Sequence, residues 1–230
     1  MTQAASAEVR IPFDGVLLSG TLSRPPQPRG IVAFAHGSGS SRLSPRNVYV
    51  ARVLFDAGFG ALLFDLLTQD EDRDYATRFD IDLLSERLRG ATRWLRDEPR
   101  ARGLPLGYFG ASTGAAAALV AAADAHSGIG AVVSRGGRPD LAGAQALGRV
   151  RAPTLLIVGG EDHEVIVLNR DAYARLRCEK SLSIVPGATH LFEEPGTLET
   201  VAARAAQWFT RHLASPIAGR DAGISPESSS

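Results

Sequence analysis

Short apolar runs alternate with longer segments of helical periodicity along most of this 230-residue chain. The first two runs, Val9–Phe13 and Val16–Leu22, flank Asp14-Gly15, a pair that is typical of a tight β-hairpin turn. The third run, Ile31–Ala35, is apolar at every position, as in a strand that is buried on both faces of a parallel sheet. The pattern therefore predicts a hairpin followed by the first strand of a parallel sheet.

Predicted helices and strands then alternate to the end of the periodic region. In Ile81–Asp97, for example, Leu84, Leu88 and Leu95 recur at helical spacing. The predicted helices are Arg46–Ala57, Ile81–Asp97, Thr113–Ala125, Leu141–Val150, Val167–Leu176 and Leu198–Leu213. The predicted strands between them are Gly60–Leu66, Leu106–Gly110, Ala131–Ser134, Thr154–Val158 and Leu182–Val185. This alternation predicts an α/β fold with a mostly parallel sheet and helices on both faces.

The same pattern bounds one domain, which we place at residues 8–214. The segment 215–230 is rich in Ser, Gly and Pro and lacks periodicity, so we expect a disordered tail. The connection from Ala131–Ser134 to the next helix is too short to hold a cap domain. The polar segment Thr68–Arg78 is interpreted either as a mobile flap over the site or as a solvated connection.

Charge and composition narrow the choice of partners. The 25 lysine and arginine residues balance 25 aspartate and glutamate residues, and no basic stripe suggests nucleic acid. No polybasic amphipathic segment, long apolar span or signal peptide is apparent, so we expect no membrane partner and a cytoplasmic location. Cys178 is the single cysteine, which excludes an intramolecular disulfide. We expect a small-molecule substrate and a monomer or homodimer.

A candidate nucleophile lies at the junction of a predicted strand and a predicted helix. Residues 110–114 read Gly-Ala-Ser-Thr-Gly, the G-x-S-x-G pattern in the strand–turn–helix context that it requires. Ser112 would occupy a sharp turn, and Gly110 and Gly114 leave room for the backbone to approach closely. The start of the next helix would favour negative charge near Ser112.

A serine hydroxyl needs a general base, and the base needs an acid that orients it. In this arrangement the chain order is serine, acid, histidine. Asp162 follows the predicted strand Thr154–Val158, and two glycines precede it in a turn. Asp162 is preferred to Glu161 and Glu164 because it fits the spacing G-x-x-D-x-x-V that this fold uses. We therefore take Asp162 as the acid.

The base is assigned to one of five histidines. His190 follows the last predicted strand, in a loop from which it could reach Ser112. His36 precedes a helix and is better interpreted as part of an oxyanion loop, whereas His163 adjoins Asp162 too closely to be oriented by it. The remaining two histidines, His126 and His212, are interpreted as structural or solvated.

Two backbone N–H groups are expected to hold the oxyanion. One belongs to Thr113, directly after the nucleophile, and the other to Ser38, in a Gly/Ser loop after the strand Ile31–Ala35. Glycines at 37 and 39 would let this loop approach a ligand. The alternative is a flexible loop without a catalytic role.

Two arginines are candidates for substrate binding. Arg135 and Arg138 flank two glycines at the carboxyl end of a predicted strand, where ligands bind in open α/β sheets. Either could contact an anionic group of a substrate, and the alternative is an ion pair with an acid such as Asp140. The acidic run at 161–164 has no supporting His/Cys cluster, so we expect no metal and no cofactor.

With these residues placed, the chain resembles the dienelactone hydrolase-like branch of the α/β-hydrolase family from Val9 to Leu213. The motifs that carry this resemblance are AHGSGSSR (35–42), SPRN (44–47), FDLLTQ (64–69), FGASTG (109–114), SRGGRPDLA (134–142), PTLLIVGGED (153–162) and THLFEEPG (189–196). The resemblance implies the α/β-hydrolase fold without a cap and the triad Ser112, Asp162 and His190. Dienelactone hydrolase itself has a cysteine nucleophile, whereas this chain has a serine.

The expected reaction is hydrolysis of a small carboxylic ester, lactone or thioester through an acyl-enzyme. Acyl transfer to another acceptor and cofactor-free haloperoxidase-type chemistry are the enzymatic alternatives. A non-catalytic binding protein on the same scaffold is a further alternative, but such proteins typically lose a triad residue, and none is lost here.

Overall fold

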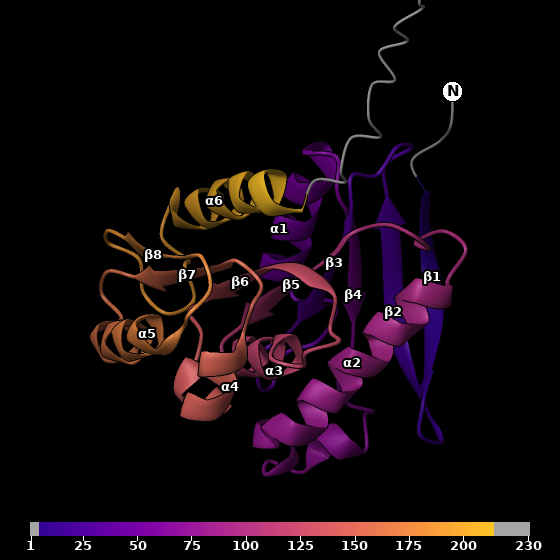
Figure 1. Cartoon of the computed structure of the whole chain (residues 1–230), viewed down its shortest axis with the longest axis horizontal. Coiled ribbons are helices and arrows are strands. Elements are labelled where there is room, and N and C mark those ends of the chain that lie inside the picture. The colour runs from indigo at the N-terminus through magenta and orange to yellow at the C-terminus, as the bar shows by residue number, and fades with distance from the viewer. Residues whose placement is uncertain (1–4, 214–230) are drawn as a thin grey trace, which may run out of the picture.

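The computed structural model describes residues 5–213, which form an eight-stranded sheet between two layers of helices (Figure 1). The strand order is β1-β2-β4-β3-β5-β6-β7-β8. The strands are β1 (Ala5–Phe13), β2 (Val16–Arg24), β3 (Ile31–Ala35), β4 (Gly60–Phe64), β5 (Leu106–Ala111), β6 (Ile129–Arg135), β7 (Thr154–Gly159) and β8 (Lys180–Val185). Strands β4, β3 and β5–β8 run parallel to one another, and β1 and β2 extend one edge in antiparallel fashion.

The predicted hairpin is present at that antiparallel edge. Asp14 and Gly15 have φ angles of 43° and 78°, the left-handed conformations that a two-residue type I′ turn requires. Phe13 pairs with Val16 directly beside the turn. The sequence pair Asp-Gly is therefore used for its backbone conformation.

Helices cover both faces of the sheet. Figure 1 shows α1 (Pro45–Asp56) and α6 (Thr197–His212) on one face, and α2 (Ile81–Asp97), α3 (Thr113–Ala122), α4 (Gly143–Arg149) and α5 (His163–Arg175) on the other. Alternate residues of β3 belong to different hydrophobic clusters: Val32 and Phe34 to the α1/α6 side, Ile31 and Ala33 to the α2/α3 side. This explains why the strand is apolar at every position.

Two predicted helices differ from those observed. The segment Leu141–Val150 is not one helix, because a 3₁₀ turn at Pro139–Ala142 is followed by α4, which begins at Gly143, and the φ of 75° at Gly143 interrupts a right-handed helix. Helix α5 begins at His163 rather than at Val167, because the turn after β7 leads directly into it. The predicted tail at 215–230 lies outside the described residues.

The segment between β4 and α2 contains two 3₁₀ turns, Glu71–Arg73 and Thr77–Phe79. Glu71 forms an ion pair with the buried Arg87 of α2, with 2.6 Å between Oε1 and Nη2. Tyr75, between the two turns, is 70% exposed. The segment is thus anchored on α2 and exposes its middle.

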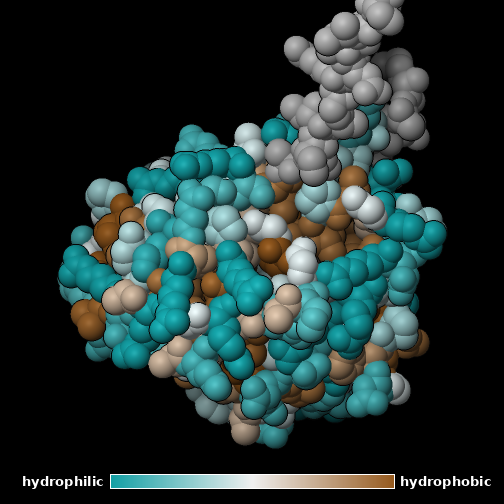
Figure 2. Space-filling view, in the orientation of Figure 1, coloured by the Kyte–Doolittle hydropathy of each residue, from teal (hydrophilic) through white to brown (hydrophobic). Residues whose placement is uncertain are grey.

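The surface of the described region is mainly hydrophilic, as is usual for a globular α/β protein. Figure 2 shows hydrophilic residues over most of one face, with hydrophobic residues in separate patches. Within residues 5–213, no helix combines the length and the apolar character that crossing a membrane requires. The loops that follow the parallel strands at their carboxyl ends hold the predicted site residues.

Candidate active site

Ser112 lies in a strained turn between β5 and α3. Its backbone has φ 50° and ψ −121°, a region that residues with a Cβ rarely adopt. Such a conformation persists only where the surrounding structure holds it. Here the N–H of Ser112 donates to the carbonyl oxygen of Arg135 on the adjacent β6, at 3.2 Å. The chain therefore maintains at Ser112 the sharp turn that the motif predicted.

The glycines of the motif are required by close backbone contacts. A Cβ on Gly110 would overlap the backbone of Ala115, and a Cβ on Gly114 would overlap the carbonyl oxygens of Ala35 and His36. Strand β3, the turn and α3 are therefore packed backbone against backbone. No larger side chain fits at either glycine without moving these elements.

Asp162 and His190, the predicted acid and base, are in contact. Asp162 immediately precedes α5, His190 follows β8, and Oδ2 of the carboxylate lies 2.7 Å from Nδ1 of the imidazole. A hydrogen bond from Nδ1–H to the carboxylate leaves Nε2 free to accept a proton. The His190 ring also packs near Gly136, which follows β6, since a Cβ on Gly136 would lie 3.5 Å from Nδ1 of His190. Across residues 5–213, the hydrogen bonds include none between His190 and Ser112.

The rival acids and histidines lie elsewhere. Glu161 is 4.0 Å from His163, and both side chains are largely exposed. His126 is on the surface, and the ring of His212 packs against that of Trp208 at a tilt of 53°, with 4.3 Å between centroids. Of the acids considered, Asp162 is the one whose carboxylate contacts His190.

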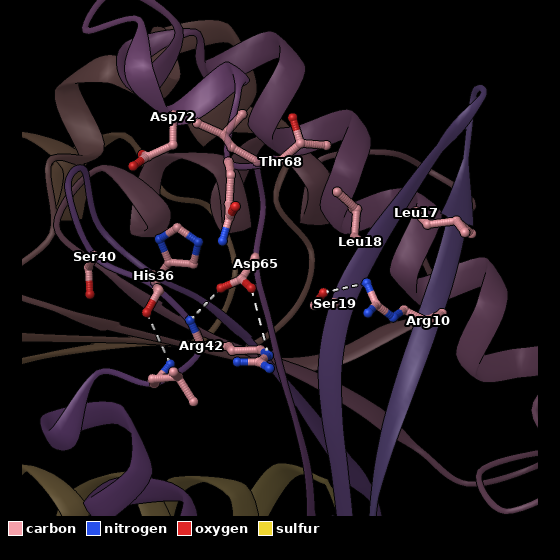
Figure 3. A pocket seen from close by; sticks show the side chains of 14 residues that line it. Arg10, Leu17, Leu18, Ser19, His36, Ser40, Arg42, Asp65, Thr68 and Asp72 are labelled. Carbon is pink, nitrogen blue, oxygen red and sulfur yellow. Dashed lines mark hydrogen bonds and ion pairs between the residues drawn. The ribbon is translucent and has the colours of Figure 1, made fainter.

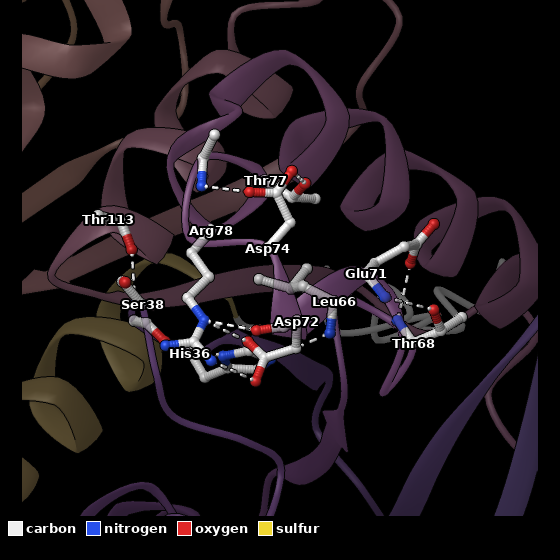
Figure 4. A network of polar contacts seen from close by, with 12 residues as sticks. His36, Ser38, Leu66, Thr68, Glu71, Asp72, Asp74, Thr77, Arg78 and Thr113 are labelled. Carbon is white, nitrogen blue, oxygen red and sulfur yellow. Dashed lines mark hydrogen bonds and ion pairs between the residues drawn. The ribbon is translucent and has the colours of Figure 1, made fainter.

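His36 fixes the loop that follows β3. Its Nε2 accepts the N–H of Leu66 at 3.0 Å, and its Nδ1 donates to the carbonyl oxygen of Gly37 at 3.0 Å. Because one nitrogen accepts and the other donates, the ring is neutral. Burial lowers the pKa of His36, although the Gly37 carbonyl and the Asp65 and Asp72 carboxylates oppose this shift. Figure 4 shows His36 beneath Asp72 and Arg78, which pair with each other.

The structure brings Ser38 and Thr113 together. The N–H of Ser38 donates to Oγ1 of Thr113 at 2.8 Å, so this predicted oxyanion donor has an acceptor within the protein (Figure 4). A Cβ on Gly37 would lie 3.8 Å from Oγ of Ser112, which places the loop backbone against the nucleophile. The hydroxyl of Thr113 was missed in the sequence, where only its N–H was considered. The oxyanion role of both residues stays a prediction.

An open hollow lies beside this loop. It has a volume of about 660 Å³ and is bordered by the β1–β2 hairpin and by the loops after β3 and β4 (Figure 3). Asp65 accepts the N–H of Arg42 at 2.8 Å and lies 3.7 Å from its Nε, which ties two of these loops together. Both residues fall within motifs quoted above, but their pairing could not be read from the sequence. The residues that line this hollow include His36 but not Ser112, Asp162 or His190.

The two candidate arginines have different surroundings. Arg138 forms a two-pronged ion pair with Asp140, at 2.9 and 2.7 Å, which is the alternative expected for it. Arg135 is 7% exposed, and its Nη2 lies 3.5 Å from Oδ1 of Asn47. Burial, together with the charge of Arg46, lowers the pKa of Arg135 to about 10, so it remains protonated at neutral pH.

Three features define the α/β-hydrolase class. They are the order of the strands, the strained turn at Ser112, and the Asp162–His190 pair at the carboxyl ends of the parallel strands. Residues 18–214 match the dienelactone hydrolase family, and the chain belongs to that family. The predicted resemblance and fold class are confirmed. In the described chain, β6 passes to α4 without an inserted cap.

Two solved structures share the fold of this chain, and a relative matched by sequence has a different name. A dienelactone hydrolase from Anabaena variabilis has 56% identity and a TM-score of 0.88, covering 92% of this chain and all of that one. Est1E from Butyrivibrio proteoclasticus, at 16% identity and a TM-score of 0.76 over 89% of this chain and 98% of that one, shares the fold. A Mycobacterium tuberculosis protein named provisionally as a phosphoribosyl transferase is 60% identical over 91% of this chain, which spans 47% of that protein. Family and solved neighbours support a hydrolase-type enzyme.

Proposed function

We propose that this chain is a serine hydrolase that cleaves small carboxylic esters, lactones or thioesters through an acyl-enzyme. Ser112 is the nucleophile, His190 the general base and Asp162 the residue that orients it. The observation that carries this proposal is the 2.7 Å contact between Asp162 and His190 at the sheet edge where Ser112 occupies its strained turn. No cofactor is needed for this chemistry.

The reaction proceeds in two halves. Oγ of Ser112 forms a bond to the carbonyl carbon while Nε2 of His190 takes its proton. The tetrahedral intermediate collapses, the bond to the leaving group breaks, and His190 returns the proton to the leaving oxygen or sulfur. Water then attacks the acyl-enzyme with the same base and releases the acid. The Asp162 carboxylate stabilises the imidazolium that forms in each half.

Two backbone N–H groups are candidate donors to the oxyanion, and they differ in whether they already have an acceptor. The N–H of Thr113 begins α3, where the helix dipole favours negative charge. The N–H of Ser38 would have to exchange the Thr113 hydroxyl for the oxyanion when substrate binds. We assign the larger contribution to Thr113, because its N–H is an orphan donor of the first helical turn.

A fluorophosphonate probe tests the nucleophile directly. The folded protein should be labelled at Ser112, as located by peptide mass spectrometry, and should turn over 4-nitrophenyl esters. Ser112→Ala should lose both, because no hydroxyl is left to attack, while keeping the melting temperature. Ser127→Ala is the control, since this serine lies before the amino end of β6, whereas Ser112 follows the carboxyl end of β5. Labelling of the Ser112→Ala variant, or none of the wild type, would contradict the proposal.

Added alcohols separate hydrolysis from acyl transfer. With a hydrolase, the free acid remains the main product when methanol or glycerol is added at millimolar concentration. A new ester as the main product would favour the acyltransferase alternative. Halide oxidation in the presence of peroxide and a carboxylic acid tests the haloperoxidase-type alternative in the same way.

The name of the mycobacterial relative indicates a second reaction in that protein. This chain spans 47% of the relative, and its own residues 18–214 match the dienelactone hydrolase family. We propose that the phosphoribosyl transferase name applies to the part of the relative that this chain does not match. The isolated chain is then expected to hydrolyse esters and to release no pyrophosphate from phosphoribosyl pyrophosphate with a purine base.

A further inference from the structure

A second hollow lies at the amino ends of β7 and β8, whereas Ser112 follows the carboxyl end of β5. It has a volume of about 460 Å³ and is bordered by the residues after α3, by the end of α4 and by the segment before β8. Figure 1 shows α3, α4 and α5 on the same face of the sheet, and α4 contacts both of the others. Three arginines line this hollow, together with a cysteine and small or apolar residues: Arg149, Arg151 and Arg177. We call it the basic hollow, because no acidic side chain of residues 5–213 lines it.

The three arginines of the basic hollow have no partner in the described part of the chain. All three are exposed, and none forms an ion pair or a side-chain hydrogen bond with residues 5–213. Other arginines close to them in the sequence are paired: Arg175 contacts Asp171 at 2.7 Å, and Arg211 contacts Glu179 at 3.0 Å. Glu179 is only two residues after Arg177, yet its carboxylate lies by Arg211 instead. The guanidinium groups of the hollow are thus left free for a ligand.

Two acids line an adjoining hollow that shares Arg149, and both are engaged with other groups. Oδ1 of Asp124 accepts the N–H of His126 at 2.8 Å, and Oε1 of Glu86 pairs with Arg89 at 2.5 Å. Neither acid lines the basic hollow, and neither forms an ion pair with Arg149. The positive charge of the basic hollow is therefore not balanced by an ion pair among residues 5–213.

The nearby helix ends do not account for these arginines. Cations are favourable beside the last carbonyl groups of a helix, and α3, α4 and α5 all end near the hollow. At the end of α5, however, Nζ of Lys180 donates to the carbonyl oxygens of Tyr173 and Leu176, at 2.7 and 2.6 Å. At the end of α3, Oγ of Ser127 donates to the carbonyl oxygen of Ala122 at 3.3 Å. The helix ends thus use other donors, and the arginines make no such hydrogen bond within the described chain.

The number of guanidinium groups favours phosphate as the ligand. A phosphate monoester carries a charge of about −1.5 to −2 at pH 7 and has three acceptor oxygens, whereas a carboxylate has one charge and two oxygens. The fork of N–H donors on each arginine matches phosphate oxygens in pairs, so several arginines can share one phosphate. The volume of about 460 Å³ lies within the range of small-molecule sites, about 300–1,000 Å³. The hollow therefore has room for more than a single phosphate ion.

We propose that the basic hollow binds a small molecule with a phosphate or diphosphate group, whose oxygens accept hydrogen bonds from Arg149, Arg151 and Arg177. The hollow lies at the amino ends of the strands, and the proposed acyl-enzyme forms at the carboxyl ends. The ligand is therefore not the ester that Ser112 attacks. The inference goes beyond the proposed hydrolase and does not depend on it.

Calorimetric titration of the full chain with pyrophosphate, at constant ionic strength, tests the proposal. One pyrophosphate should bind per chain, and acetate should give no saturable signal. Arg151→Gln and Arg177→Gln should each raise the Kd by about 10-fold or more, because each removes a charge-assisted hydrogen bond. Arg170→Gln is the matched control, since this arginine of α5 is also exposed and unpaired within residues 5–213 but lies outside the basic hollow. Its Kd should stay within about twofold of wild type, because a distant surface charge contributes little.

The position of the bound anion can be measured at Cys178. This residue is the single cysteine of the chain, is partly buried and lines the basic hollow. Alkylation by iodoacetamide, a neutral reagent, should slow in proportion to the fraction of protein that holds pyrophosphate, because the anion covers the thiol. Acetate at the same ionic strength should leave the alkylation rate unchanged.

Four results would overturn the assignment. The first two are no saturable binding of pyrophosphate by the wild type, and wild-type affinity in a folded variant that combines Arg149→Gln, Arg151→Gln and Arg177→Gln. The third is an unchanged alkylation rate of Cys178 at saturating pyrophosphate, which would place the anion elsewhere. The fourth is binding of duplex DNA through these arginines without binding of pyrophosphate, which would make the hollow a nucleic-acid contact.

Discussion

At the scale of single residues, the candidate site is defined by which acidic side chain contacts His190. Asp162 contacts His190 at 2.7 Å, while the adjacent Glu161 lies by the exposed His163. A carboxylate at Nδ1 fixes the tautomer that leaves Nε2 available as a base. The contact therefore distinguishes two neighbouring acids that have the same charge and almost the same position in the chain.

Replacing each acid by its amide tests this distinction. Asp162→Asn should lower kcat for a 4-nitrophenyl ester by about 10,000-fold, because the amide stabilises the wrong tautomer of His190 and no longer balances its positive charge. Glu161→Gln, the matched control, should stay within about twofold of wild type, since surface charges contribute little. Steady-state kinetics and melting temperatures of both variants provide the measurement. Equal losses in the two variants would remove Asp162 from its assigned role.

At the scale of elements, local patterns predicted what local chemistry determines. Three elements could be predicted because their signals lie in neighbouring residues: the Asp-Gly turn from its turn conformation, β3 from its burial on both faces, and α2 from its helical spacing. The break at Gly143 was missed, because a positive φ cannot be told from an ordinary helical glycine in the sequence. Contacts between distant segments, such as Ser38 with Thr113 or Glu71 with Arg87, were likewise invisible. They depend on the packing of whole elements.

The junction of β3, the serine turn and α3 should be the least tolerant of these elements. Gly114→Ala places a methyl group into the carbonyl oxygens of Ala35 and His36, which are backbone atoms that cannot rotate away. We expect it to lower the free energy of unfolding by roughly 3 kcal/mol. Gly148→Ala in α4 meets open space and should raise it by about 0.5 kcal/mol, since alanine is the better helix former. Urea unfolding of both variants decides, and equal stabilities would contradict the packing argument.

At the scale of the whole molecule, the carboxyl edge of the sheet concentrates features that cost stability. Three such residues lie at or just beyond the ends of β3, β5 and β6: a serine with positive φ, a neutral buried histidine, and a buried arginine whose Nε has no acceptor among residues 5–213. Such features are more easily tolerated where a ligand or a reaction uses them. The two faces of the sheet, in contrast, pack apolar side chains against the helices on either side. The molecule is thus a three-layered scaffold in which the strained serine turn lies at the carboxyl ends of the parallel strands.

His36 should make the stability of this edge depend on pH. Burial lowers the pKa of His36 below its usual 6.5, against the opposing effect of Asp65 and Asp72. A lowered pKa in the folded state means that the unfolded chain takes up the proton first. The contribution of His36 to the free energy of unfolding is therefore complete above pH 6.5. It falls as the pH drops from 6.5 to the folded-state pKa, by at most about 1.4 kcal/mol per pH unit.

The variant His36→Asn tests this pH dependence. Its free energy of unfolding, measured with urea between pH 8 and pH 5, should change less with pH than that of the wild type. His126→Asn, whose side chain is 97% exposed, should leave the wild-type slope unchanged. Burial also lowers the pKa of His212, but that residue is present in all three proteins and its contribution cancels. A wild-type slope in the His36→Asn variant would show that the histidine beneath the predicted oxyanion loop does not titrate on unfolding.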